Sequence, residues 1–348
     1  MKKSLRFISV FAILTLLLCS VMSACTAADE TDSGQENTQT ESQEENLHTR
    51  KAKVAIIQYS SYTALDECCQ GIQNVLSEAK LEYDVAVGSS SAPEEDCQEF
   101  AQDIATNGGY DLIITIGTPA SSAVYSSISS SSRTPVVFCA VTDPVGAGLV
   151  VSNERPQNNC TGVAAAFNIT EQLNMINTFQ PSITKLGVIY SKNEQNTVEQ
   201  LKTLEKEAKK LGITLYAKGV EDASELNDAA AEMVPEVEAI TLLPDNMVAA
   251  NSWNIVNQAI IGNKPVYGVT QTQIKEGCLA GYCYDFTALG EKTGETAVSI
   301  LKGQSAAETP VTAVSDCTLY VNTDVLDNLE LEIPKEYSDA QKVTTSYE

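Results

Sequence analysis

The sequence has almost no histidine, and this absence limits the chemistry that the protein can perform. Its single histidine, His48, lies in a polar stretch near the N-terminus. The rest of the chain therefore cannot form a Ser-His-Asp or Cys-His catalytic site, or a histidine-rich metal site. The patterns GxGxxG, GxxxxGK[ST] and CxxC are missing as well. We therefore expect no cofactor, no metal ion and no catalytic residues.

Basic residues are also scarce. The chain has 22 lysine and arginine residues against 46 aspartate and glutamate residues, which gives a net charge of −24. Nucleic-acid binding requires a basic surface, so we do not expect a nucleic-acid partner. Beyond residue 24, no apolar run is long enough to span a bilayer.

The first 24 residues have the three parts of a secretory signal. A basic start precedes an apolar run over residues 7–18, and small residues precede Cys25. The tripeptide Ser-Ala-Cys resembles the bacterial lipobox, in which the cysteine is lipidated before cleavage, although Met22 stands where leucine is usual. We therefore predict a signal peptide over 1–24 and lipidation of Cys25. The alternative is an ordinary cleaved signal.

A polar and acidic segment follows over residues 25–50. Leu47 is the only large apolar residue in it. Such a segment cannot bury enough surface to fold, and its like charges extend it. We predict a disordered tether between a membrane anchor and a globular body. A tail without this role would have the same composition.

Eight cysteines remain in the body of the chain. They are Cys68, Cys69, Cys97, Cys139, Cys160, Cys278, Cys283 and Cys317. An even number of cysteines in an exported chain could form disulfides. Most of them, however, lie inside apolar runs such as VVFCAV and CLAGYCYDF. This placement favours buried free thiols.

Beyond residue 52, apolar strands alternate with amphipathic helices. Runs rich in valine and isoleucine predict strands at 53–60, 83–89, 110–117, 134–141, 185–191, 213–220, 238–245 and 264–271. The intervals have apolar residues at helical spacing, as in TVEQLKTLEKEAKKLG. This alternation indicates an α/β fold in which parallel sheets are covered on both faces.

The strands fall into two similar blocks, at about 52–150 and 165–275. We interpret the blocks as two doubly wound lobes that are joined by crossing hinge strands near 159–168 and 278–286. Ligands bind beyond the carboxyl ends of the strands in such sheets, which places a cleft between the lobes.

Domain boundaries follow from these crossings. A helix over about 287–301 and a strand over 317–322 are expected to return to the first lobe. The predicted boundaries are 51–160 with about 284–325 for lobe one, 161–283 for lobe two, and 326–348 for a C-terminal segment that returns to lobe two.

Polar and aromatic residues follow the predicted strand ends. They are Tyr59, Tyr62, Thr118, Asn196, Thr197, Asp245 and Asn246. Helix N-termini bind anions, so a carboxylate could lie near Thr118 or near Asn196 and Thr197. Asp245 could bind an ammonium group, and the two tyrosines could stack on an apolar group. Each residue also has a structural interpretation, as a helix cap or as a core residue.

Several motifs together resemble one family. The string TPVVFCAVTDPVGAGLV has TALD before it and NCTGV, GVIYSKNEQNT and LLPDN after it. These motifs resemble the tryptophan- and tyrosine-type binding lipoproteins among the ABC transporter substrate-binding proteins. The resemblance extends from about residue 53 to 325, with the motifs in the same order.

The resemblance implies a type I periplasmic-binding-protein-like fold and an extracytoplasmic lipoprotein on the cell membrane. It also implies a small-molecule ligand, with an amino acid as the first candidate, and delivery to an ABC permease driven by a separate ATPase. By motif, the residues that would face the cleft are Tyr62, Thr118, Asp143, Asn196, Thr197, Asp245 and Asn246. The family often has a histidine where this chain has Tyr62, which leaves open whether the ligand is aromatic.

Two other functions fit parts of the sequence. A sensor-type binding protein would have the same fold and cleft, and would present its ligand to a membrane receptor instead of a permease. An enzyme without histidine would have to use carboxylates. The acidic run at 94–96 is, however, more typical of a solvated surface.

Overall fold

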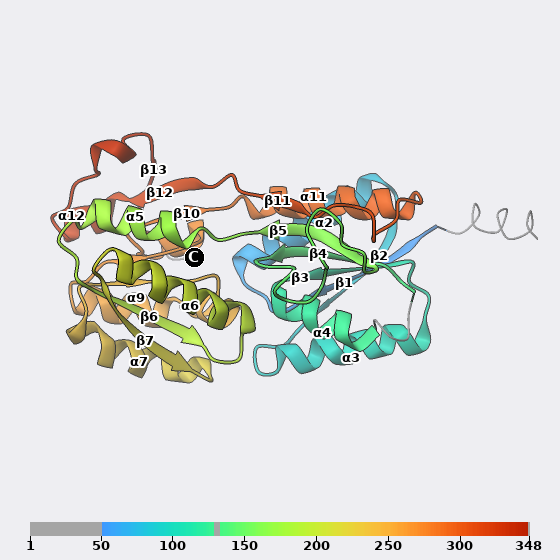
Figure 1. Ribbon diagram of the computed structural model, residues 1–348, viewed down its shortest axis with the longest axis horizontal. Helices are drawn as coiled ribbons and strands as arrows, with labels where there is room; N and C mark the ends of the chain where they lie inside the picture. The colour runs from blue at the N-terminus through green and yellow to red at the C-terminus, as the bar shows by residue number, and fades with distance from the viewer. Residues whose placement is uncertain (1–50, 129–132, 347–348) are drawn as a thin grey trace, which may run out of the picture. The chain divides into compact units, whose positions relative to one another are not determined.

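The computed structural model describes residues 51–128 and 133–346 (Figure 1). The predicted signal peptide, the predicted lipidation site Cys25 and the predicted tether lie outside the described residues. The described chain forms two lobes, each with one sheet and helices on both faces. The predicted α/β fold with two doubly wound lobes is therefore confirmed.

The first lobe contains a six-stranded parallel sheet with the order β11-β5-β4-β3-β1-β2. Its strands are β1 Lys53–Gln58, β2 Glu82–Val87, β3 Leu112–Ile116, β4 Val136–Val141, β5 Cys160–Ala165 and β11 Thr312–Val314. Its helices are α2 Thr63–Glu78, α3 Pro93–Asn107, α4 Thr118–Ile128 and α11 Phe286–Leu301. The central strands β1, β3 and β4 are almost wholly buried and rich in valine and isoleucine, because helices cover both faces.

The second lobe contains a seven-stranded sheet with the order β13-β12-β10-β9-β8-β6-β7. Its strands are β6 Lys185–Ser191, β7 Thr214–Val220, β8 Ala239–Thr241, β9 Val266–Tyr267, β10 Ala280–Cys283, β12 Thr318–Asn322 and β13 Gln341–Val343. Its α-helices are α5 Ile169–Phe179, α6 Gln195–Lys210, α7 Leu226–Met233, α8 Asn246–Ala250, α9 Trp253–Ile261, α10 Gln271–Lys275 and α12 Thr323–Asn328. Three short 3₁₀ helices are η1 Ala223–Glu225, η2 Val234–Glu236 and η3 Lys335–Tyr337.

The described chain passes between the two lobes three times. It crosses after β5, returns between β10 and α11, and crosses again between β11 and β12. Two of the predicted boundaries therefore need correction. Residues 161–165 extend the first sheet, because β5 pairs with β4. Residues 318–322 lie in the second sheet, because β12 pairs antiparallel with β10 and buries Leu319 and Val321 in the second lobe.

The C-terminal segment lies against the second lobe. Strand β13 pairs in parallel with β12 at the edge of the second sheet. Tyr337, in η3, stacks on Phe179 of α5 with the ring centroids 5.7 Å apart. These contacts attach β13 and η3 to the second lobe.

The predicted free thiols are confirmed for the described cysteines. All eight are unpaired, and seven of them are buried. Cys317 is the partly exposed one, and it lies between β11 and β12, where the chain crosses between the lobes. A free cysteine inside a core acts as a small apolar side chain, so most of these residues contribute to packing.

Membrane insertion of the described body would need a long apolar helix. Among the residues that the structure describes, none of the helices combines the length and the apolar character needed to span a bilayer.

Two glycines allow α2 and α11 to pack closely in the first lobe. A Cβ atom on Gly290 would collide with the backbone carbonyl of Cys68, and one on Gly71 would collide with the backbone carbonyl of Thr287. The two backbones thus touch at positions where only glycine fits. This contact holds α11, which follows the second crossing, on the first lobe.

Gly290→Ala tests this helix contact. Alanine in a helix interior ordinarily stabilises a protein by about 1 kcal/mol relative to glycine. Here the added methyl group forces the helices apart, so we expect the free energy of unfolding to fall by about 1–3 kcal/mol. Urea denaturation followed by circular dichroism measures this change. The exposed neighbour variant Glu291→Ala should change stability by less than about 0.5 kcal/mol. A gain in stability for Gly290→Ala would contradict the close contact.

Candidate ligand-binding site

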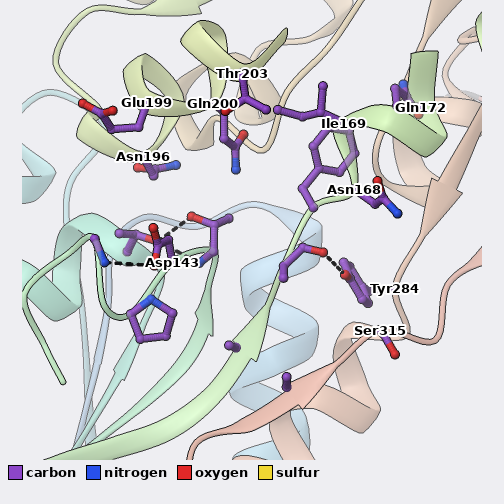
Figure 2. A pocket seen from close by; sticks show the side chains of 18 of the residues that line it. Asp143, Asn168, Ile169, Gln172, Asn196, Glu199, Gln200, Thr203, Tyr284 and Ser315 are labelled. Carbon is purple, nitrogen blue, oxygen red and sulfur yellow. Dashed lines mark hydrogen bonds between the residues drawn. The ribbon is translucent and has the colours of Figure 1, made fainter. Parts of the chain in front are cut away.

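A cavity with a volume of about 780 Å³ lies between the two lobes. The first lobe contributes Thr118 and the loop after β4, which includes Asp143. The second lobe contributes the start of α5 and the first turns of α6 (Figure 2). The crossing segments form the remaining wall. The cavity thus lies beyond the carboxyl ends of parallel strands, as predicted for this type of sheet.

A smaller cavity of about 60 Å³ adjoins the first. The two cavities share Thr118, Thr142, Phe167, Asn196, Tyr282 and Tyr284. The smaller one also has Tyr62 and Phe286 in its lining. Five aromatic side chains therefore surround a narrow space next to a wide polar one. This combination suits a ligand with an aromatic part and a polar part.

The charged side chains described in the linings of both cavities are all acidic. None of the described residues in their linings is lysine, arginine or histidine. Carboxylates are present, at Asp143, Glu171, Glu199 and Asp245. A positively charged group on a ligand is therefore favoured, and a carboxylate would need N–H or O–H donors. The described chain also lacks a cluster of three or more side chains able to hold a metal ion.

Donors of this kind are available on the first lobe. Helix α4 begins at Thr118 directly after Gly117, whose φ of +94° allows the sharp turn out of β3. The first N–H groups of a helix have no acceptor within the helix, and they carry the positive end of its dipole. The Thr118 hydroxyl accepts a hydrogen bond from the Thr142 N–H at 3.3 Å, which holds the two loops together.

A bulge shapes the end of β4 beside the cavity. The register with β5 shifts between Phe138 and Val141, and Ala140 in the shift has a φ of +55°. Such a conformation is uncommon for a residue other than glycine, and bulges often re-aim side chains beside binding sites. Ala140 lines the smaller cavity.

A buried carboxyl group, that of Glu194, holds the start of α8 behind the cavity. Glu194 precedes α6 but turns its side chain toward α8. Its oxygens accept hydrogen bonds from the Asn246 N–H at 3.0 Å, the Asn246 side-chain nitrogen at 2.6 Å and the Met247 N–H at 2.9 Å. Burial, together with the nearby charge of Asp245, raises the pKa of Glu194 to about 8.

Asp245 caps α8. Its two oxygens accept hydrogen bonds from the Val248 N–H at 2.9 Å and the Ser191 N–H at 2.6 Å. The residue is only 1% exposed, and burial raises the pKa of its carboxyl group.

One direct hydrogen bond crosses between the lobes beside the smaller cavity. The Tyr62 hydroxyl donates to the side-chain oxygen of Asn246 at 2.9 Å. Burial raises the pKa of Tyr62 well above its usual value, so its hydroxyl keeps the proton that it donates. At the hinge, the Tyr284 hydroxyl donates to the Ala166 carbonyl at 2.7 Å and joins two crossing segments (Figure 2).

Comparisons with known proteins identify the family. Residues 53–343 match the model of the ABC transporter substrate binding protein family. The chain belongs to this family.

Individual relatives and solved structures agree with this family assignment. A tyrosine-binding protein of Clostridioides difficile is 29% identical over 95% of this chain and 94% of its own length. An ABC domain from Streptococcus pneumonia in complex with L-Trp is 28% identical, with a TM-score of 0.79 over 84% of this chain and 100% of that one. A substrate-binding protein with adhesive properties from Clostridium difficile, in its ligand-free, open form, is also 28% identical. Its TM-score is 0.64 over 85% of this chain and 100% of that one.

Six of the eight residues predicted for the site of this substrate-binding protein lie in the two linings. They are Tyr62, Thr118, Asp143, Asn196, Asp245 and Asn246. Tyr59 and Thr197 do not line either cavity. Tyr59 is part of the core of the first lobe, and Thr197 is fully buried with its hydroxyl directed at the Pro244 carbonyl.

Other lining residues were not predicted. They include Phe167, Asn168, Gln172, Gln200, Tyr282 and Tyr284. Glu194, which lies behind the lining, was not predicted either. Phe167, Asn168, Tyr282 and Tyr284 lie in the predicted crossing segments, so the hinge position was a usable signal. Gln200 lies four residues after Asn196, one helical turn along α6, and this spacing was a signal too. The sequence contains no comparable signal for Glu194.

The raised pKa of Glu194 predicts how stability depends on pH. The folded protein keeps a proton up to about pH 8 that the unfolded chain releases near its ordinary pKa of 4.5. The stability from this group is therefore complete at low pH and is lost as the pH rises through this window. Relative to Glu194→Gln, the wild-type free energy of unfolding should fall by up to about 1.4 kcal/mol per pH unit between pH 5 and 8.

Urea denaturation at a series of pH values measures this difference. The exposed variant Glu205→Gln on the same helix serves as the control, and its curve should run parallel to the wild type. A constant difference between wild type and Glu194→Gln from pH 5 to 8 would show that Glu194 does not titrate in this range.

Proposed function

We propose that this protein is the extracytoplasmic substrate-binding lipoprotein of an ABC importer, and that it captures an aromatic amino acid between its lobes. The observation that carries the proposal is the paired cavity, which joins an aromatic-lined space to a polar space without any basic side chain. An amino acid has the matching parts, an apolar side chain and a zwitterionic head.

The names of two relatives narrow the choice of ligand. One is named a tyrosine-binding protein, and another was crystallised with L-Trp. We propose that this chain binds L-tyrosine or L-tryptophan, with the ring against Tyr62, Phe167 and Tyr284 at the smaller cavity. Residues at the cavity such as Tyr62, Thr118 and Asn196 would thus be ligand-binding residues.

Closure of the lobes would trap the ligand. A ligand that touches both lobes favours the closed state, because only that state provides all of its contacts. The Tyr62–Asn246 hydrogen bond would contribute to the same equilibrium, because it requires the lobes to meet. At equal sequence identity, the structure has a higher TM-score to the complex with L-Trp than to the ligand-free, open protein, which supports assigning it to the closed state.

Delivery would take place at the membrane. In the proposed function, lipid chains on Cys25 hold the protein at the outer face of the cell membrane, and residues 26–50 tether the body to this anchor. Two or more lipid chains give stable anchoring. The partner would be a permease driven by a separate ATPase, which accepts the ligand from the closed form.

Calorimetry with L-tyrosine and L-tryptophan tests the ligand. The protein is unfolded and refolded first, so that carried-over ligand is removed. At a ligand concentration of about a hundred times Kd, we expect stabilisation by about 2.7 kcal/mol, seen as a rise in Tm of several degrees. Simple sugars and nucleosides serve as controls. A shift with one of these, and none with any amino acid, would reject the proposed ligand.

Cys25→Ser tests the anchor. Without the thiol no lipid can be attached, so we expect the protein to move from the membrane fraction to the medium or the soluble fraction. Immunoblots of cell fractions measure this redistribution, with Cys317→Ser as the matched control. Retention of Cys25→Ser in the membrane fraction would reject lipid anchoring at this residue.

A further inference from the structure

Four side-chain amide oxygens at the larger cavity have no donor. The side-chain oxygens of Asn153, Gln172, Asn196 and Gln200 are buried, and none of them accepts a hydrogen bond from any residue that the structure describes. All four residues line the larger cavity. Burying an acceptor without a donor lowers stability, so such groups are retained where another molecule supplies the donor. They indicate that the ligand presents N–H groups to this wall.

Neighbouring acceptors fix the orientation of two of these amides. The Asn196 nitrogen donates to the Pro244 carbonyl at 2.9 Å. The Gln172 nitrogen donates to the Gly268 carbonyl at 3.3 Å, and Gln172 itself is 1% exposed. Rotating either amide by half a turn would place its oxygen against a carbonyl oxygen and remove the bond. The oxygens therefore stay free to accept hydrogen bonds from a ligand.

A carboxylate stands across the cavity from two of these oxygens. Figure 2 shows Asp143 on one side, and Asn196 and Gln200 of α6 on the other. One oxygen of Asp143 accepts a hydrogen bond from the Gly146 N–H at 2.9 Å. A carboxylate can accept about four hydrogen bonds, so Asp143 retains capacity after this one. Asn196 and Gln200 are four residues apart and thus lie on the same face of the helix.

We propose that the ammonium group of the ligand is held between the carboxylate of Asp143 and the amide oxygens of Asn196 and Gln200. This inference rests on the proposed function, because it concerns the head group of the same amino acid. An ammonium group has three N–H donors, and the site offers three acceptors from two lobes. All three hydrogen bonds form together only when the lobes are closed. The ammonium group thus contributes to closure as well as to specificity.

In this arrangement Asp143 is the ammonium partner, in place of Asp245, which the sequence suggested. Asp245 is only 1% exposed, and its oxygens accept the backbone N–H groups of Ser191 and Val248, which hold the start of α8 beside the end of β6. Asp245 then has a structural role, as the cap of α8 beside the smaller cavity. The carboxylate of the ligand is left to the donors near Thr118 on the first lobe.

A comparison of two ligands in several variants tests the assignment. The ligands are L-tryptophan and indole-3-propionate, which is the same molecule without the ammonium group. If the protein prefers tyrosine, the pair is L-tyrosine and 3-(4-hydroxyphenyl)propionate. Calorimetry measures the dissociation constants of both ligands for the wild type, Gln200→Met, Gln200→Glu and Asp143→Asn. Where the ligand without the ammonium group binds weakly, its constant is measured by competition against the amino acid. Asp143→Asn keeps an oxygen for the Gly146 N–H and removes the charge.

Gln200→Met and Asp143→Asn should each weaken amino-acid binding by about tenfold or more. The same variants should change binding of the acid that lacks the ammonium group by less than about twofold, because that ligand has nothing to donate at this point. Gln200→Glu keeps an acceptor and should retain affinity for the amino acid. Gln98→Met, at a half-buried glutamine outside both cavities, is the control and should change neither constant.

The possible failures can be told apart. Equal losses for both ligands, or no loss for the amino acid, would overturn the ammonium assignment and leave the proposed function standing. Loss of amino-acid binding in Gln200→Glu as well as in Gln200→Met would assign Gln200 a structural role and overturn its part in the site. No binding of tyrosine or tryptophan by the wild type would overturn the proposed function and the assignment with it.

Discussion

The hydrogen-bonded chain from Tyr62 through Asn246 to Glu194 joins the two lobes and sets the geometry between them. The Asn246 side chain accepts from Tyr62 with its oxygen and donates to Glu194 with its nitrogen. Glu194 in turn accepts the first N–H groups of α8, so a buried carboxyl group determines where Asn246 lies. Hydrogen bonds in such a chain polarise one another in a low-dielectric interior. The wall of the smaller cavity therefore depends on a group that lies outside both linings.

Among the described residues, neither lining has a basic side chain, and this determines how a zwitterion can be bound here. An ammonium group finds carboxylate and amide oxygens, whereas a carboxylate depends on helix N–H groups and hydroxyls. In our proposal the acceptors come from both lobes and the donors mainly from the first. A ligand with both charges would then satisfy its head group only in the closed cleft. This division links recognition of the ligand to the state that a transporter partner would accept.

The hinge consists of three crossing segments, where the sequence predicted two. The described chain crosses between the lobes three times, and the Tyr284–Ala166 hydrogen bond joins two of these crossings beside the cavity. Two other features lie at the cavities beside this hinge. The bulge at Ala140 borders the smaller cavity, and the partly exposed Cys317 borders the larger one. Changes in lobe position therefore act directly on residues that line the ligand cavity.

Local patterns in the sequence were sufficient to predict the alternation of strands and helices, the two lobes, the buried thiols and six residues of the cavity linings. These features depend on local patterns, because apolar runs, helical spacing and strand ends are set by neighbouring residues in the chain. Four other features could be read only from the folded protein. They are the pairing of β12 with β10, the bulge at Ala140, the turn of Glu194 toward α8 and the opposition of Asp143 to Asn196 and Gln200. These features join residues that are distant along the chain. Their contacts depend on how the two lobes pack and on which hydrogen-bond partners burial leaves available, and a local pattern carries no information on either.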